Sequence, residues 1–505
     1  MTETSDAPRL GLVTKVSYGF GSVAQATAGV ALAQGTITYF LIRVVGMRPA
    51  LVGLIILLSL AADAIFDPLL GRLSDTLRTP WGRRHPFMYA SALPIAIGII
   101  FLWRPPHGLP PAGIAAYILI VLVLLRLSVS LYQIPSDALT PELAPDYHDR
   151  TSLISFRYFF GYFGGTAVSV ILGTVFLRRD ASHPLGQNDP AAYANASVLV
   201  AIITFVAILI SAGATHRYIG RLWRAPTRQL TLMQALKEIA TIFGNPSLMV
   251  VMGAGLLSGI ATGVSGFVGS FVSYYFWGLT PQVASLIGLF AAPSFFIGVF
   301  LAPMVSRAFD KKRTMIAVFA LAIVAGVIPP ALRLIGLMPP NGSPWLPVVL
   351  VIDSFVSGTL AITGFIIVGS MIADVTEDNA VKTGVRSEGL LFAASNLLPK
   401  FAPGIGGMIG AMIIEVVKFP VGAQTSVIDH VDPAIMRNMV MLWLPTTMAL
   451  NLTAVALLLL YRLDRSSHEA NLEALSRAAS LMAAPSSLPT GVTPVPDPGA
   501  ASPLV

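Results

Sequence analysis

The sequence predicts an all-α polytopic membrane protein of twelve transmembrane helices arranged in two six-helix halves. Of its 505 residues, 55% are hydrophobic and only 11% are charged, whereas an ordinary soluble domain carries about 25% charged residues. The polar residues fall in short groups between apolar runs, and about 20 apolar residues are enough for a helix to cross the hydrocarbon core. Lipid is therefore the solvent of most of the chain.

Twelve segments are long and apolar enough to span a bilayer, given the helical rise of about 1.5 Å per residue. They are residues 17–42, 50–71, 86–103, 111–139, 153–177, 194–215, 247–277, 281–304, 314–334, 346–373, 387–414 and 436–461.

The loops divide the chain into five regions. These are an N-terminal tail (1–16), a first half (17–215), a central loop with an amphipathic surface helix (216–246), a second half (247–462) and a disordered tail rich in Ala, Ser and Pro (463–505). The motif at Asp67-Pro68, Gly71-Arg72 and Asp75 is echoed at Ala302-Pro303, Ser306-Arg307 and Asp310. Such a repeat is typical of transporters that rock two halves about a central site, although so short an echo is also compatible with chance.

The distribution of Lys and Arg predicts the topology. Of the 32 Lys and Arg residues, twenty-one lie on the side of both termini and eight on the other side. Because cytoplasmic loops retain positive charge, both termini are expected in the cytoplasm of a multi-pass protein of the plasma membrane, here the bacterial inner membrane. The basic charge reflects this topology together with attraction to anionic membrane lipid, no nucleic-acid partner is expected, and we expect a monomer.

The second predicted span contains two acidic side chains. Asp63 and Asp67 stand four residues apart, with Ser59 one turn before them, so all three share one helix face. Ionisable groups are costly at this depth and repel one another when both are charged, which a bound cation or a shared proton relieves. The pattern predicts a coupling-cation site; the alternative is a structural ion pair with another helix.

A second polar stripe follows the fourth span. Arg126, Ser130, Gln133 and Asp137 recur at helical spacing on an otherwise Leu-rich helix. Such a stripe indicates a wet surface, and we assign Arg126, Gln133 and Asp137 to substrate binding.

Three more polar residues lie inside predicted spans. Arg157 either pairs with an acid or donates its planar fork to a substrate oxygen. Lys400 requires a carboxylate partner, and the acids of the second span are the candidates. Asn396 shares its helix face, one turn before it, and is expected to bind substrate.

Several motifs resemble one known family. They are Lys15-x-x-Tyr18-Gly19-x-Gly21, Asp63-x-x-x-Asp67-Pro68-x-x-Gly71, Asp75-x-x-x-Thr79-x-x-Gly82-Arg83-Arg84, Arg150-Thr151 with Arg157, Asp374-x-x-Glu377, and Gly384-x-Arg386-x-Glu388-Gly389 with Lys400. Their order resembles the glycoside-pentoside-hexuronide cation symporters of the major facilitator superfamily (melibiose permease-like). The resemblance implies the major facilitator fold. It also implies that Asp63 and Asp67 hold the coupling cation, that Ser130 adds a hydroxyl ligand and that Lys400 sits beside them.

The sequence departs from that family at informative positions. Ala26 and Gln133 replace acids that hold galactoside hydroxyls, which argues against a melibiose-like substrate. Phe66 replaces an asparagine that helps to bind sodium, which favours H⁺ over Na⁺ as the coupling cation. Arg126 has no counterpart in the resemblance and suggests an anionic solute such as a uronide.

The expected function is secondary active symport of a glycoside, uronide or related small organic solute by alternating access. Carriage of an amphiphilic or lipid-like solute is the alternative within the same class. A membrane-embedded enzyme would need a clustered nucleophile, base or metal set, and the sequence has no Cys and no HExxH or phosphate-loop motif. No catalytic residue, metal or other cofactor is expected. A non-transporting sensor or scaffold would leave the intramembrane charges unexplained.

Overall fold

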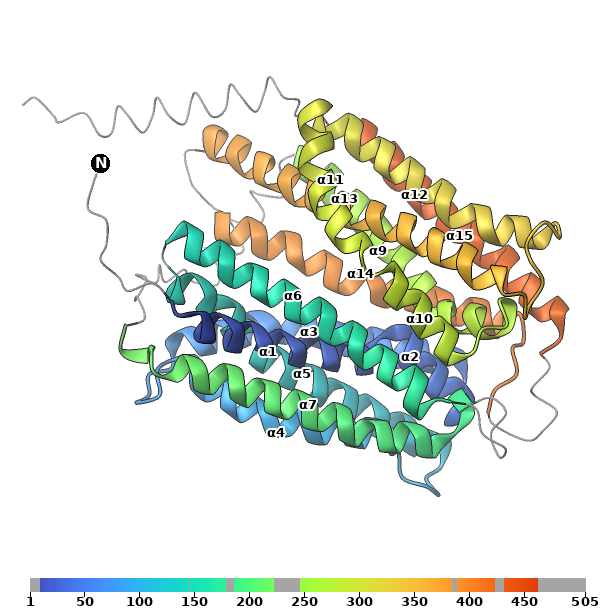
Figure 1. Ribbon diagram of the computed structural model, residues 1–505, viewed down its shortest axis with the longest axis horizontal. Helices are drawn as coiled ribbons and strands as arrows, with labels where there is room; N and C mark the ends of the chain where they lie inside the picture. The colour runs from blue at the N-terminus through green and yellow to red at the C-terminus, as the bar shows by residue number, and fades with distance from the viewer. Residues whose placement is uncertain are drawn as a thin grey trace, which may run out of the picture.

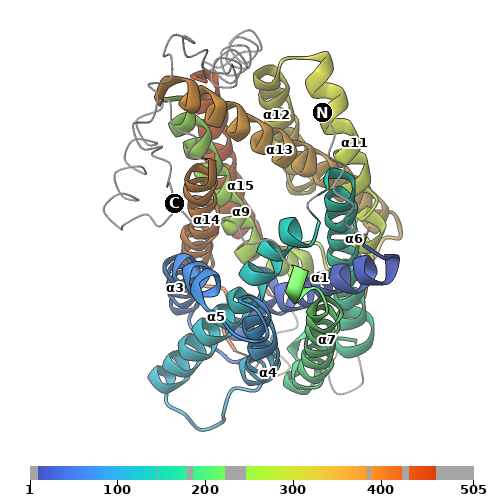
Figure 2. The same cartoon turned by 90° about the vertical axis from the view of Figure 1, so that its left-hand side faces the viewer.

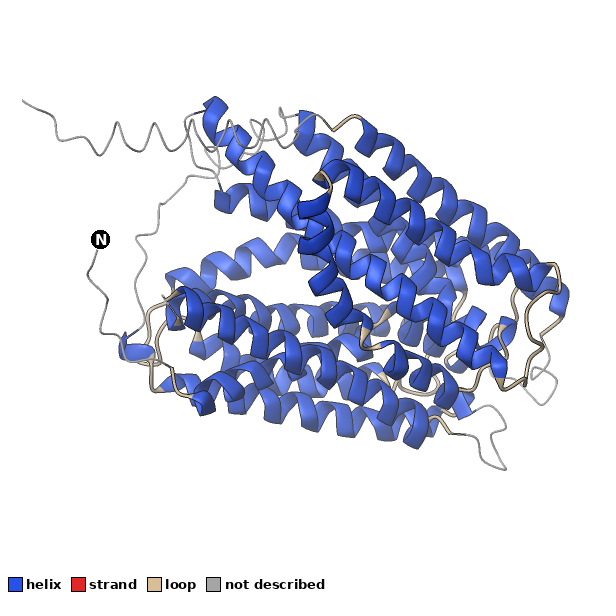
Figure 3. Ribbon diagram, turned by 45° about the horizontal axis from the view of Figure 1, so that its top comes forward, coloured by secondary structure: helices blue, strands red, loops and turns tan. Residues whose placement is uncertain are grey.

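The computed structural model describes residues 10–144, 146–178, 186–221, 246–383, 388–422 and 431–461, with backbone but not side chains for 147–148, 221, 376–383 and 388–399. Helices joined by short loops account for these ranges, and Figure 3 shows no strand among them. An α-helix satisfies its backbone hydrogen bonds within its own segment, as the absence of water in lipid requires, so long apolar runs fold this way. The predicted all-α class is confirmed.

The first half forms the lower, blue-to-green part of Figure 1. Its elements are α1 (Leu12–Leu32), α2 (Gln34–Tyr39) with the π-helical turn η1 (Phe40–Val44), α3 (Pro49–Thr76), α4 (His85–Leu102), α5 (Pro111–Leu143), α6 (Tyr147–Ile171) with the π-helical turn η2 (Leu172–Phe176), and α7 (Pro190–His216) between the short turns η3 (Gly186–Asn188) and η4 (Ile219–Arg221).

The second half forms the upper, yellow-green-to-red part of the same view. Its elements are α9 (Pro246–Phe271) with the π-helical turn η5 (Val272–Phe276), α10 (Pro281–Ala291), α11 (Ser294–Ala308), α12 (Lys311–Leu334), α13 (Trp345–Thr383), α14 (Glu388–Val416) and α15 (Pro433–Leu459).

The helices agree with the twelve predicted spans. Ten described helices or helix pairs are long and apolar enough to cross a membrane, and α1–α2 and α14 take the positions of the first and eleventh predicted spans. The first span is interrupted at Ala33 and the eighth at Pro293, while α13 continues well past residue 373. The predicted surface helix of the central loop and the C-terminal tail lie outside the described residues.

Three helices begin with the same local device, a capping side chain followed by proline. The Asp189 and Asp432 carboxylates each accept a hydrogen bond of 2.8 Å from the backbone N–H two residues on. Thr280 Oγ1 accepts one from Val283 at 3.3 Å. The prolines that follow them fix a helical φ and lack an N–H that would otherwise be unsatisfied, so each sequence sets a sharp helix start.

The two halves close against each other at the end of the bundle away from Arg72, Arg83, Arg84 and Arg150; we call these two ends the closed end and the arginine-rich end. At the closed end, the fully buried Arg43 of η1 donates to the carbonyl oxygens of Pro420 and Gly422, both at 3.0 Å. Gly422 N–H donates back to Ile42 at 3.0 Å. Gly422 has a φ of +88°, so glycine suits this turn better than other residues.

Close packing of α3 against α14 positions the charged site. Figure 2 views the helices nearly end-on, with α3 beside α14 and α6 beside the α10–α11 pair. A Cβ atom at Gly53 of α3 would lie 2.6 Å from the Ala411 side chain, and one at Gly404 of α14 would lie 3.1 Å from Leu57 and Leu60. The small residues thus allow the two helices, one from each half, to approach closely.

We predict that the arginine-rich end faces the cytoplasm, as the charge distribution requires. Ala308→Cys, at an exposed position there, should react with a membrane-impermeant maleimide only after intact cells are permeabilised. His107→Cys, exposed at the closed end, is the matched control and should react from outside, since the native chain has no cysteine. The reverse pattern would overturn this topology.

Candidate functional site

The acids of α3 face the polar stripe of α5. Ser130 Oγ donates a 2.9 Å hydrogen bond to Asp63 Oδ1, and Arg126 Nε donates a 3.1 Å bond to Ser59 Oγ. Residues four apart share a helix face, so the two stripes predicted from spacing meet along one line of contact between α3 and α5.

Lys400 of α14 completes this group from the other half. Its ammonium forms an ion pair with Asp67 Oδ2. The prediction that Lys400 pairs with an acid of the second span is therefore confirmed, and the four residues Asp63, Asp67, Ser130 and Lys400 lie together.

One oxygen of this group has no partner among the described side chains. Asp67 Oδ1 is buried and makes no hydrogen bond to any described residue. Buried polar atoms are rarely left unsatisfied, so such an atom points to a proton, an ion or water. Asp63 and Asp67 lie near two cations, the ammonium of Lys400 and the guanidinium of Arg126, which is bound to Ser59. The acceptor Asp67 Oδ1 fits a proton or a monovalent cation.

A cavity of about 900 Å³ is lined by residues of α1, α5, α6 and α11. Its lining runs from Arg150 and Pro141 at the arginine-rich end to Ser22 and Gln25 at depth. The volume falls in the range of small-molecule sites, about 300–1,000 Å³. Gln133 and Asp137 of the α5 stripe line it, so one helix face connects the acid cluster with the cavity.

The Arg157 side chain forms part of the wall of this cavity. Its guanidinium forms an ion pair with Asp137 and donates to Thr140 Oγ1 at 3.0 Å and to Tyr18 OH at 3.3 Å. These bonds join α6 to α5 and α1. Of the two roles open to Arg157, the geometry favours structural pairing, while the side chain of Asp137 remains 49% exposed to the cavity.

Two predicted substrate residues are not described in the wall of this cavity. Arg126 stands beside Ser59 and the acid cluster and is not among the residues that line the cavity. The side chain of Asn396 lies outside the described residues.

Several residues of interest at the site were not predicted from the sequence. Gln25 lines the cavity and donates to Asp137 Oδ1 at 3.5 Å, and Tyr158, Tyr162 and Phe295 form another part of its wall. Asp353 is half-buried about two turns into α13, and no hydrogen bond or ion pair joins it to the described residues. A single acid within the apolar run of residues 346–356 was the signal that could have found Asp353.

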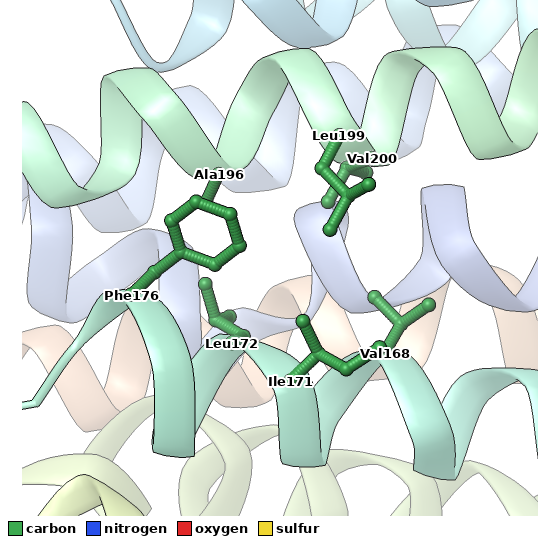
Figure 4. Close-up of a pocket in the computed structure, with 7 residues that line it drawn as sticks. All are labelled: Val168, Ile171, Leu172, Phe176, Ala196, Leu199 and Val200. Atoms are coloured by element: carbon green, nitrogen blue, oxygen red, sulfur yellow. The ribbon is translucent and has the colours of Figure 1, made fainter.

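Other cavities are poorer candidates for a transport site. One of about 810 Å³ near Trp103 is lined by the first half alone, and a hydroxyl-rich one of about 150 Å³ lies at the closed end. Figure 4 shows a third, where Leu172 and Phe176 face Ala196 and Val200 of α7. Its volume of about 10 Å³ is at most that of one water.

Two helical halves that enclose a polar cavity beside intramembrane charges define a membrane transporter of the major facilitator fold. Residues 17–465 match the family described as MFS/sugar transport protein, and the chain belongs to that family. It is thus a secondary transporter and not an enzyme.

Relatives and solved structures agree with this assignment. The chain is 23% identical over 493 residues to the uncharacterized symporter sll1374 of Synechocystis, covering 82% of this chain and 87% of the relative. It is 25% identical to the isoprimeverose transporter of Lactiplantibacillus pentosus, covering 85% and 84%. A mutant of the nucleoside transporter NupG has a similar fold, with a TM-score of 0.62, 15% identity and coverage of 88% and 99%. The inward open xylose transporter XylE of E. coli also has a similar fold, with a TM-score of 0.59 and 15% identity, covering 91% of this chain and 98% of XylE.

We predict that Arg157 contributes to stability through its bonds to α1 and α5. Arg157→Met should lower the free energy of unfolding by about 2 kcal/mol, allowing for the half-exposed Asp137. The matched control is Arg48→Met, which removes the ion pair with Glu415 where Arg48 is 79% exposed and should cost less than about 1 kcal/mol. Thermal unfolding in detergent compares the two; equal losses would contradict the structural role of Arg157.

Proposed function

We propose that this protein couples the entry of a small organic solute, a glycoside, uronide or related compound, to a cation that binds at Asp63 and Asp67. The unpartnered Asp67 Oδ1 beside the ammonium of Lys400 is the observation that supports the site best. Lys400 and the coupling cation compete for the same carboxylate, because each supplies the positive charge that it requires. Binding of the cation would therefore release Lys400 and alter the contact between the halves.

The solute would bind in the cavity, one turn along α5 from Ser130. Asp137 and the two glutamines, Gln25 and Gln133, offer acceptors and donors for hydroxyl groups. Because the cation site and this wall share α5, occupation of one alters the electrostatics of the other. In alternating access, the closed end, held by Arg43, would then open and the arginine-rich end would close.

The coupling cation is a proton in this proposal. A hard metal cation needs about six oxygen ligands, and Phe66 adds none between the acids. Protonation of a carboxylate needs no such shell. The protein would act as a monomer in the bacterial inner membrane with both termini in the cytoplasm.

We predict that Asp67→Asn or Asp63→Asn abolishes concentrative uptake, because an amide cannot exchange the coupling charge. Exchange of solute down its gradient should survive. Accumulation ratios in energised vesicles, with and without a protonophore, measure this. Asp189→Asn is the control, since asparagine also caps a helix and Asp189 lies at the start of α7. Full accumulation by Asp67→Asn would show that the Asp67 carboxylate is not part of the coupling site.

We predict a further effect of Arg126 on anionic solutes. Arg126 does not line the cavity but lies about two helical turns along α5 from Gln133, so its charge acts on a bound uronide through space. Arg126→Gln should raise the apparent KM for uronides about tenfold and leave neutral glycosides nearly unchanged. Initial uptake rates on matched uronide and glycoside pairs provide the comparison. An unchanged KM for uronides in a well-expressed variant would contradict this role and favour neutral glycosides as the substrate class.

A further inference from the structure

The cavity has two chemically different walls. Gln25, Gln133 and Asp137, on α1 and α5, make one wall polar. On α6 and α11, Tyr158, Tyr162 and Phe295 make the other wall aromatic. Arg157 lies between them and is engaged by Asp137, so its charge is already balanced within the protein.

The aromatic wall is an ordered group of three rings. Tyr162 stacks on Phe295 with ring centroids 4.7 Å apart and planes inclined by 27°. Tyr158 stands beside them, 6.4 Å from Phe295, and is 60% exposed. In a cavity that also contains Arg157, Asp137 and Arg150, such exposed ring surface contacts water and gains free energy when a flat apolar group covers it.

This wall is also where the two halves meet at the cavity. Among the described side chains that line it, Phe295 alone comes from the second half. A ligand held by the polar wall of the first half therefore reaches the second half through the ring of Phe295. A ligand can shift a two-state equilibrium only through contacts that differ between the states, and a contact that bridges the halves is of this kind.

We propose that the transported solute carries an aryl group, as an aryl glycoside or aryl uronide, whose ring stacks against Tyr158, Tyr162 and Phe295 while its polar end binds Gln25, Gln133 and Asp137. This inference rests on the proposed transport function and names its substrate class. Aromatic pairs gain energy beyond the burial of their area, which distinguishes an aryl group from a saturated one of similar size.

The test measures ligand binding by protection of a single cysteine in purified full-length protein. Ile154→Cys lines the cavity, and its alkylation by N-ethylmaleimide is followed with phenyl and methyl members of matched hexoside and hexuronide pairs. The phenyl member of at least one pair should protect at about a tenfold lower concentration than the methyl member. The same advantage should appear as competition in an uptake assay.

Variants of adjacent phenylalanines provide the controls. Phe295→Leu should reduce the phenyl advantage to about twofold or less, whereas Phe295→Tyr should retain it, because only the latter keeps a ring. Phe296→Leu is the matched control, since Phe296 packs on Phe163 and edge-to-face on Phe295 but is not among the residues lining the cavity. It should retain the full advantage, and monodisperse elution of each variant verifies folding.

Three results would contradict the inference. Equal protection by phenyl and methyl members, or an advantage that survives in Phe295→Leu, would exclude the aromatic wall while leaving the transport function intact. Failure of every hexoside and hexuronide both to protect the cysteine and to enter energised vesicles would overturn the inference together with the proposed function.

Discussion

The ion pair between Lys400 and Asp67 is the interaction on which the account of this transporter depends. It joins α14 of one half to α3 of the other within the membrane domain, where an unpaired charge is costly. Close packing around Gly53 and Gly404 brings these helices together. Asp63 adds a second carboxylate, and Asp67 Oδ1 has no partner among the described side chains, so the cluster offers an acceptor to a proton or cation.

Helix α5 connects this cluster with the cavity. Ser130 contacts Asp63, and one turn further along Gln133 and then Asp137 line the cavity. A change of charge in the acid cluster therefore acts on the polar wall along one face of α5, where low dielectric strengthens electrostatic effects. The closed end is held by a different chemistry, the bonds of Arg43 to backbone carbonyls, so the acids act on it only through the packing of α3 against α14.

Hydropathy predicted the helices because lipid imposes length and apolarity on every span. Helical spacing predicted the two polar stripes, and the cost of a buried lysine predicted its pairing with an acid of the second span. The aromatic wall could not be found this way, since Tyr162 and Phe295 are far apart in sequence and meet only when α6 packs near α11. The break at Pro293 has a local cause, because proline lacks the backbone N–H that would continue the helix. The roles of Arg126 and Asn396 remain predictions.

The most direct measurement of the central claim follows the pH inside proteoliposomes while solute enters in sodium-free buffer. A trapped pH dye reports proton movement, and a labelled solute reports uptake in the same sample. The account predicts acidification of the lumen that keeps pace with solute entry and disappears with Asp67→Asn. Solute entry that requires sodium, or that proceeds with no change of internal pH, would contradict proton coupling at the Asp63 and Asp67 cluster.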